Sequence, residues 1–293
     1  MPIRPRRSVL YMPGSNARAL EKARTLPADS LILDLEDAVG PEQKEAARFQ
    51  ITDAIRSGSF GNREIIIRIN ALDTTWAAGD IALVATLAPH AVLLPKVSSP
   101  GDIMKAARDF RAAGVPEPTR LWAMMETPMA IINADAIART AADPSSRLSM
   151  LVMGTNDLAR ETRARLTRGR AGMLPWLSTC VAAARAHGAD ILDGVYNDIH
   201  DIEGLRAECE QGRDMGFDGK TLIHPNQIDV CNAVFAPDEA EIAWARQVIA
   251  AFEEPVNVGK GAISLDGKLV ERLHAEIARR TLAIAGALKD TST

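Results

Sequence analysis

The sequence predicts an α/β protein, a closed (β/α)₈ TIM barrel with a C-terminal extension made of helices and a short hairpin-like segment. Short apolar runs that end in Gly, Pro or an acidic residue alternate with stretches of helical spacing. Eight such units span about 225 residues, close to the length of about 250 that is typical of this barrel. Runs such as 31–33 and 65–67 are apolar throughout, as strands of a parallel sheet covered on both faces are. An open doubly wound sheet is the alternative.

Each expected strand is followed by an expected helix. The strands are predicted at 8–13, 30–37, 64–70, 91–97, 121–127, 150–157, 191–196 and 220–225. Apolar residues at helical spacing predict helices that include 17–26, 43–55, 103–113, 129–141, 174–187 and 204–215. Pro41 favours the start of the second of these.

The sequence pattern changes after the eighth unit. A helix is predicted at 237–252, glycines punctuate a short strand at 262–265, and a last helix is predicted at 270–288. We therefore predict a catalytic barrel domain over 1–236 and an extension over 237–293. Because a barrel is complete without this tail, the extension must bury its apolar residues on the barrel or on a neighbouring subunit of a homo-oligomer.

Composition excludes several classes of partner. The chain has 293 residues, 47% of them apolar, and a net charge of −4, so it offers no basic field for nucleic acid or an anionic membrane. No run of 18 apolar residues is present that could cross a bilayer. Its three cysteines are odd in number and far apart, which disfavours disulfides and zinc and indicates a reducing cytoplasm.

Polar residues stand at the ends of the expected strands, at the end of a barrel where active sites form. Glu126 and Asp157 follow neighbouring strands and could meet at one hard cation. Magnesium suits them, because it commonly takes one or two protein carboxylates and completes its shell with water and substrate oxygens. The alternative is that each carboxylate caps the helix that follows it.

Arg68 ends a strand of isoleucines, where it could clamp a substrate carboxylate. The alternative is an ion pair with Asp34, Glu36 or Asp37. We expect Glu36 and Asp37 to orient the arginine and metal-bound waters from outside the first coordination shell. Asn156, beside Asp157, is a further candidate for substrate binding.

Other basic residues permit more than one interpretation. Lys96 could form a Schiff base, but beside carboxylates it is expected to stay protonated as a charge partner. His224 could act as a base, although a structural role at its turn is favoured. The five arginines of 160–170 could form a lid loop or a solvated face. Phosphates at the barrel rim could be met by Arg7, Arg18 and Lys22, which could equally be surface charge.

Taken together, the motifs resemble those of the citrate lyase beta-subunit-like family of CoA-ester lyases, which includes malyl-CoA and citramalyl-CoA lyases. The segments that carry the resemblance are 7–16 (RSVLYMPGSN), 33–39 (LDLEDAV), Arg68, 94–97 (LPKV), 125–128 (METP), 154–158 (GTNDL) and 219–228 (GKTLIHPNQI). The resemblance implies a magnesium-dependent barrel that cleaves or forms a carbon–carbon bond of a 3-hydroxyacyl-CoA. It also implies metal ligation by Glu126 and Asp157 and substrate binding by Arg68.

In family members with the extension, the resemblance implies a catalytic base, an aspartate donated by a neighbouring subunit of a trimer or hexamer. The segment 259–262 (GKGA) matches, but Glu271 stands where the aspartate is expected. The extra methylene shifts the carboxylate by about 1 Å, which can cost on the order of a hundredfold in rate. Asp266 is a less favoured substitute, because it lies in an apparent turn with Gly267.

The leading hypothesis is therefore a magnesium-dependent lyase acting on a short 3-hydroxy-dicarboxyl-CoA thioester of the malyl-, citramalyl- or citryl-CoA type. Glu271 is its provisional base. The alternatives are a 2-keto-acid aldolase or a CoA thioesterase on the same site, and a catalytically weak subunit that binds a metabolite.

Overall fold

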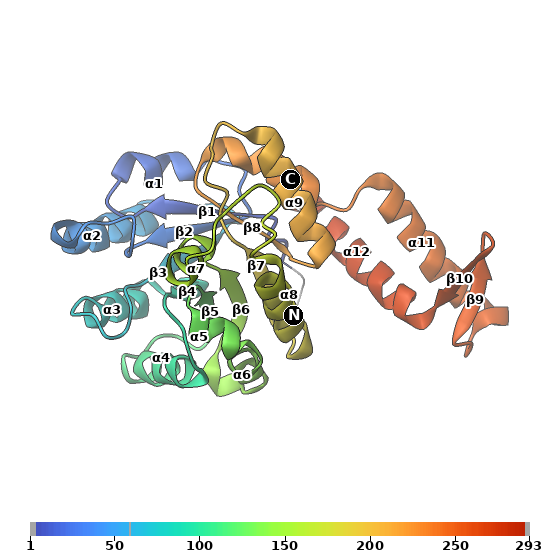
Figure 1. The fold of residues 1–293 in the computed structure, drawn as a ribbon, viewed down its shortest axis with the longest axis horizontal. Coiled ribbons are helices and arrows are strands. Elements are labelled where there is room, and N and C mark those ends of the chain that lie inside the picture. Colours follow the sequence, from blue (N-terminus) through green and yellow to red (C-terminus); the bar gives the residue numbers. More distant parts are fainter. Residues whose placement is uncertain (1–3, 59, 291–293) are drawn as a thin grey trace. The chain divides into compact units, whose positions relative to one another are not determined.

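The computed structural model describes residues 4–58 and 60–290, which fall into two compact units. One is Arg6–Ala233, a closed barrel of parallel strands in the order β1 to β8 (Figure 1). Because β1 pairs with β8 as well as with β2, the sheet closes on itself. The predicted TIM barrel is confirmed, and the open sheet is excluded. Within the described residues, no helix is long and apolar enough to span a membrane.

The strands begin within two residues of their predicted starts and seven of them end earlier than predicted. They are β1 (Ser8–Pro13), β2 (Ser30–Asp34), β3 (Glu64–Arg68), β4 (Ala91–Leu94), β5 (Arg120–Met125), β6 (Leu148–Met153), β7 (Asp190–Asp193) and β8 (Gly219–Leu222). Some of the polar residues that we placed at strand ends are indeed the last residues of their strands, as Asp34, Arg68 and Asp193 are, whereas Glu126 and Asp157 lie beyond them. Their side chains therefore stand at the carboxyl-terminal mouth of the barrel.

Helices alternate with these strands as the sequence predicts. They are α1 (Ala17–Ala23), α2 (Lys44–Arg56), α3 (Ala77–Leu87), α4 (Pro100–Ala112), α5 (Pro128–Ile132), α6 (Ala134–Arg139), α7 (Thr155–Thr162), α8 (Leu174–Ala186), α9 (Ile202–Met215) and α10 (Ile228–Phe235). The helix predicted over 129–141 is divided into α5 and α6. Asn133 leaves the helical conformation there, and its amide donates to the carbonyl of Ser98.

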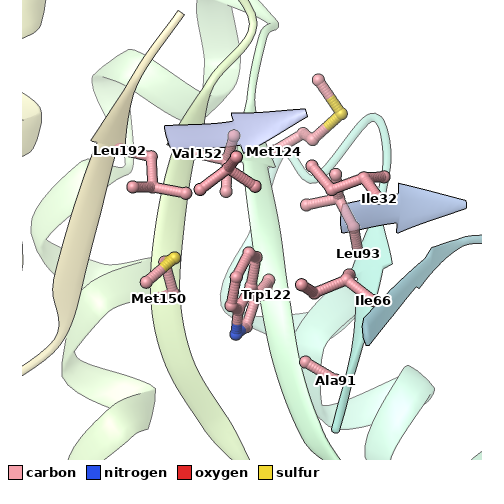
Figure 2. Packing of buried hydrophobic residues seen from close by; sticks show 10 residues of the cluster. Ile32, Ile66, Ala91, Leu93, Trp122, Met124, Met150, Val152 and Leu192 are labelled. Atoms are coloured by element: carbon pink, nitrogen blue, oxygen red, sulfur yellow. The ribbon is translucent and has the colours of Figure 1, made fainter. Parts of the chain in front are cut away.

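The barrel interior is packed with side chains and is not a channel. Trp122 is fully buried among inward-facing residues of other barrel strands, which include Ile66, Met150 and Leu192 (Figure 2). At the amino-terminal end of the strands, the guanidinium of Arg6 lies 5.5 Å from the Trp122 ring centroid. Arg6 also pairs with Glu64 and Asp190 and so covers this end. The mouth is therefore where a substrate can enter.

A buried network of charges ties the last two strands to α9 and to the arginine-rich segment. Lys220 of β8 has no exposed surface, and its ammonium lies 2.9 Å from Asp193 and 2.7 Å from Glu208. Arg170 donates to both oxygens of Asp193, at 2.7 and 2.9 Å. The last arginine of 160–170 is thus a buried structural residue. That finding corrects the two interpretations we gave for this segment, neither of which placed an arginine inside.

Replacing Asp193 by asparagine should destabilise the barrel strongly. Two buried cations lose one of the two anions that they share, and breaking a buried pair in this way typically costs about 3–5 kcal/mol. Urea unfolding followed by circular dichroism measures the change. Asp135→Asn is the matched control, since Asp135 pairs with Arg139 and His187 on the surface and its loss should leave the midpoint nearly unchanged. Equal midpoints for the two variants would contradict the prediction.

The second unit, from Val234 onward with Arg4 and Pro5, has a core of its own. It contains α11 (Glu239–Glu253), β9 (Ala262–Leu265), β10 (Lys268–Glu271) and α12 (Arg272–Asp290). Val248 of α11 packs with Ile263 and Val270 of the two strands.

The start of the last helix is corrected. Residues 270 and 271 do not open a helix but end β10, which pairs antiparallel with β9. Asp266 and Gly267 both have positive φ, +49° and +77°, which is the geometry of a two-residue hairpin turn. The turn is therefore confirmed, and Glu271 is the last residue of a strand rather than part of a helix.

Candidate active site

The two predicted metal ligands come together at the mouth. Glu126 directly follows β5, and Asp157 lies in the first turn of α7 rather than at a strand end, which corrects its predicted place. Glu126 is not a helix cap, because the side chain of Thr127 caps α5 by accepting from the N–H of Ala130. Both carboxylates line one cavity of about 320 Å³.

Gly154 permits this approach. A Cβ at position 154 would lie 2.4 Å from Cβ of Glu126 and 2.7 Å from its Oε2. Real Cβ atoms essentially never come so close, so only glycine lets α7 begin against the Glu126 side chain. The glycine of the 154–158 motif is thus part of the site.

Lys96 is the charge partner of both carboxylates, as expected. Its N–H donates to Glu126 Oε1 at 2.7 Å, and its Nζ lies 3.4 Å from that oxygen and 2.8 Å from Asp157 Oδ2. Burial acts to lower the pKa of Lys96, but its hydrogen bond to Asp157 and the charge of Glu126 outweigh it and raise the pKa. A protonated amine is no nucleophile, so the Schiff-base interpretation is not supported.

The electrostatics of the carboxylates fit a hard cation. Burial raises the pKa of Glu126, although the charge of Lys96 opposes the shift, and its Oε2 is buried without a hydrogen-bond partner. For Asp157 burial also acts upward, but Lys96 and Arg160 outweigh it and lower the pKa. Among the described residues, no cluster of three or more His, Cys, Asp or Glu side chains could hold a metal. Two carboxylates with water and substrate oxygens are the coordination that magnesium commonly accepts.

Arg68 forms the ion pairs that were its alternative interpretation. Its guanidinium donates to Asp34 from Nε at 2.7 Å and from Nη2 at 2.5 Å. Its Nη1 lies 2.8 Å from Glu36 and 3.4 Å from Asp37. Burial raises the pKa of Glu36 to about 7 against the opposing charge of Arg68. The acids hold the arginine in place, and Arg68 also lines the cavity.

The cavity wall also contains residues that the sequence did not single out. Tyr11 stacks its ring 4.9 Å from the Arg68 guanidinium. Met124 places its sulfur 3.8 Å from Arg68 Nη1 and 4.0 Å from the Tyr11 hydroxyl. Both occupy inward positions near the ends of their strands, so the alternation of side chains along a barrel strand could have found them. Asn156 lines the cavity as well, and its amide exchanges hydrogen bonds with Asn197.

Four candidate residues lie outside the cavity wall. Arg7 precedes β1 at the amino-terminal end of the barrel, where its guanidinium pairs with Asp29 at 2.7 Å. The mouth is at the opposite end, so Arg7 lies away from the cavity, and its contact with CoA phosphates stays a prediction. Arg18 and Lys22 are exposed on α1, and their contact with CoA stays a prediction. His224 caps the short helix η4 (Pro225–Gln227), which agrees with a structural role.

Comparisons with known proteins show the family of the chain. The family model HpcH/HpaI aldolase/citrate lyase matches residues 7–225. The chain is 52% identical to a (3S)-malyl-CoA thioesterase of Cereibacter sphaeroides over 97% of this chain and 96% of that protein. It is 34% identical to citrate lyase subunit beta of Escherichia coli, covering 96% of this chain and 94% of that one. A crystal structure of the Mycobacterium tuberculosis protein CitE with magnesium, acetoacetate and coenzyme A matches with a TM-score of 0.75 and 32% identity, over 96% of this chain and 98% of that one. The chain belongs to the HpcH/HpaI aldolase/citrate lyase family.

Proposed function

We propose that the protein is a magnesium-dependent CoA-ester lyase that cleaves or forms the carbon–carbon bond of a short 3-hydroxy-dicarboxyl-CoA thioester. The observation that carries the proposal is the pair Glu126 and Asp157, with Glu126 Oε2 unpaired, in one cavity with Arg68. The family supports it, since relatives include citrate lyase subunit beta and a structure containing both magnesium and CoA. Malyl-, citramalyl- and citryl-CoA are the substrates to test.

The residues divide the chemical work. When bound between Glu126 and Asp157, magnesium supplies Lewis acidity to the oxygens of the acid half. Arg68 holds a fixed positive charge beside the same cavity, where it binds substrate oxygens and stabilises negative charge that develops on them. Asn156 offers an amide for orienting the substrate. In the cleavage direction, a base must take the proton of the substrate hydroxyl, and we assign that step to the carboxylate of Glu271.

Glu271 acts, in this proposal, on the active site of a neighbouring subunit. It is exposed on the second unit, and exposed apolar residues surround it in the chain: Leu269 is 72% exposed, Leu273 50% and Ile277 60%. Such a surface suits burial against another copy of the chain in a trimer or hexamer. Arg18 and Lys22 would meet the CoA phosphates. We place the enzyme in the cytoplasm, where its three free cysteines would stay reduced.

A malyl-CoA thioesterase is the second candidate, favoured by the 52% identity to proteins of that name. Hydrolysis would use the same pocket for the acid half and direct a water to the thioester carbonyl, so that the carbon–sulfur bond breaks and the CoA thiol leaves. The two activities differ in the bond that breaks and therefore in their products.

Product analysis separates these candidates. With magnesium and each thioester in turn, we expect acetyl-CoA and a 2-oxo acid, identified by chromatography, and no activity in EDTA. Release of the free CoA thiol together with the intact hydroxy acid would favour the thioesterase instead. Cleavage of the free hydroxy acid without CoA would favour the aldolase. If none of the thioesters reacts, the proposal is wrong.

A further inference from the structure

Lys96, between β4 and α4, is held in a rare backbone conformation beside the two carboxylates. Its backbone has a φ of +54°, in the left-handed region that residues with side chains rarely adopt. Strain of this kind costs about 1–3 kcal/mol and persists only where surrounding contacts hold it. Here those contacts are made to Glu126, which accepts from the N–H at 2.7 Å and lies 3.4 Å from Nζ.

The ammonium faces the two carboxylates that would hold magnesium. Its Nζ lies 2.8 Å from Asp157 Oδ2, and Arg160 lies 2.5 Å from the other oxygen, Oδ1. Asp157 thus has a positive partner on each oxygen. Glu126 Oε1 has the Lys96 N–H and ammonium, whereas its Oε2 has no hydrogen-bond partner.

A divalent cation on these carboxylates would compete with the lysine. Inner-sphere magnesium stands about 2.1 Å from its oxygen ligands and would place two positive charges close to the ammonium. Positive charges that share the same carboxylate repel each other strongly in a partly buried site. Lys96 is only 30% exposed, so solvent screens this repulsion weakly.

We infer that Lys96 is an internal cation that sets the magnesium affinity of this site, because the metal must displace its ammonium from Asp157. This inference rests on the proposed function. Lys96 is a positioning residue: it holds the two carboxylates together and weakens metal binding in return. The strained backbone then has a purpose, since it brings both the N–H and the ammonium of one residue to the same pair of acids.

The test is a direct measurement of magnesium binding to the full-length protein. MgCl₂ is titrated calorimetrically into wild type, Lys96→Gln and the charge-conserving control Lys96→Arg. We expect the glutamine variant to bind about tenfold or more tightly, the effect of removing one competing ion pair of about 1.4 kcal/mol. Lys96→Arg should stay near wild type. In EDTA, Lys96→Gln should melt at a lower temperature than wild type, and magnesium should raise its melting temperature more.

Each outcome decides the matter. Equal or weaker magnesium binding by Lys96→Gln overturns the inference, as does an equally tightened affinity in Lys96→Arg. If Lys96→Gln does not fold in EDTA, the magnesium concentration that half-restores its near-ultraviolet circular dichroism is compared with that of Lys96→Met. If both variants need a magnesium concentration above the wild-type dissociation constant, the inference is overturned. If wild type binds no magnesium, or binds it equally after Glu126→Gln, the proposed function fails first.

Discussion

Replacing Glu126 by glutamine lowers kcat/KM for the preferred CoA thioester by about a thousandfold, equivalent to about 4 kcal/mol of transition-state stabilisation. Glutamine has nearly the same shape and can still accept the N–H of Lys96 at Oε1. What it lacks is the negative charge that a divalent cation needs, so the loss arises at the metal and not in the fold. Steady-state kinetics with saturating magnesium measures the effect.

Glu117→Gln is the matched control for this experiment. Glu117 pairs with Arg147 at 3.1 Å, and its side chain is 83% exposed, so the same chemical change occurs far from any cavity wall described above. Its activity should equal that of wild type. Retention of more than a tenth of wild-type kcat/KM by Glu126→Gln, with magnesium affinity intact, would remove Glu126 from the metal site.

Replacing Glu271 by glutamine should lower kcat by about a hundred- to ten-thousandfold, the usual contribution of a general base. The residue is exposed at the end of β10, so the variant should fold as wild type does. Magnesium binding should be unchanged, which separates this variant from Glu126→Gln. Glu276→Gln, one helical turn into α12 and also exposed, is the control and should remain active.

Co-expression of the two inactive variants tests the origin of the base. If Glu271 serves a neighbouring subunit, a mixed oligomer of Glu126→Gln and Glu271→Gln chains contains some sites in which an intact barrel meets an intact extension. Activity should then reappear in oligomers purified through separate tags on the two chains. Full inactivity of such mixed oligomers would show that Glu271 does not serve the active site of a neighbouring subunit.

Much of the barrel could be predicted because each strand has a local sequence signal. A run such as Ile65, Ile66 and Ile67 is buried on both faces, and a series of consecutive apolar residues indicates such burial. The hairpin was harder, because Val270, Leu273 and Ile277 have helical spacing although the chain turns from strand to helix after Glu271. Only the antiparallel pairing with β9, a contact between segments, decides that boundary.

The site, too, was predictable only in part. Residues at or just after strand ends, such as Arg68 and Glu126, could be placed from the sequence because barrel geometry gathers strand ends at one mouth. Their partners could not. Arg170 looks like one more surface arginine until Asp193 and Glu208, far away in the chain, surround it. Arg7 lies next to a promising motif but at the amino-terminal end of its strand, and the direction of the strand decides its role.

Gly154 affects whether the two acidic residues, when found in another sequence, indicate a metal site. Since even one methyl group at 154 would collide with the Glu126 side chain, a chain with alanine there could keep the barrel and both carboxylates yet lose their geometry. A single codon change could thus turn a lyase-like enzyme into a protein of the same fold without its metal chemistry. The two acids alone are therefore an incomplete sequence signature of the site, which must also include the glycine at position 154.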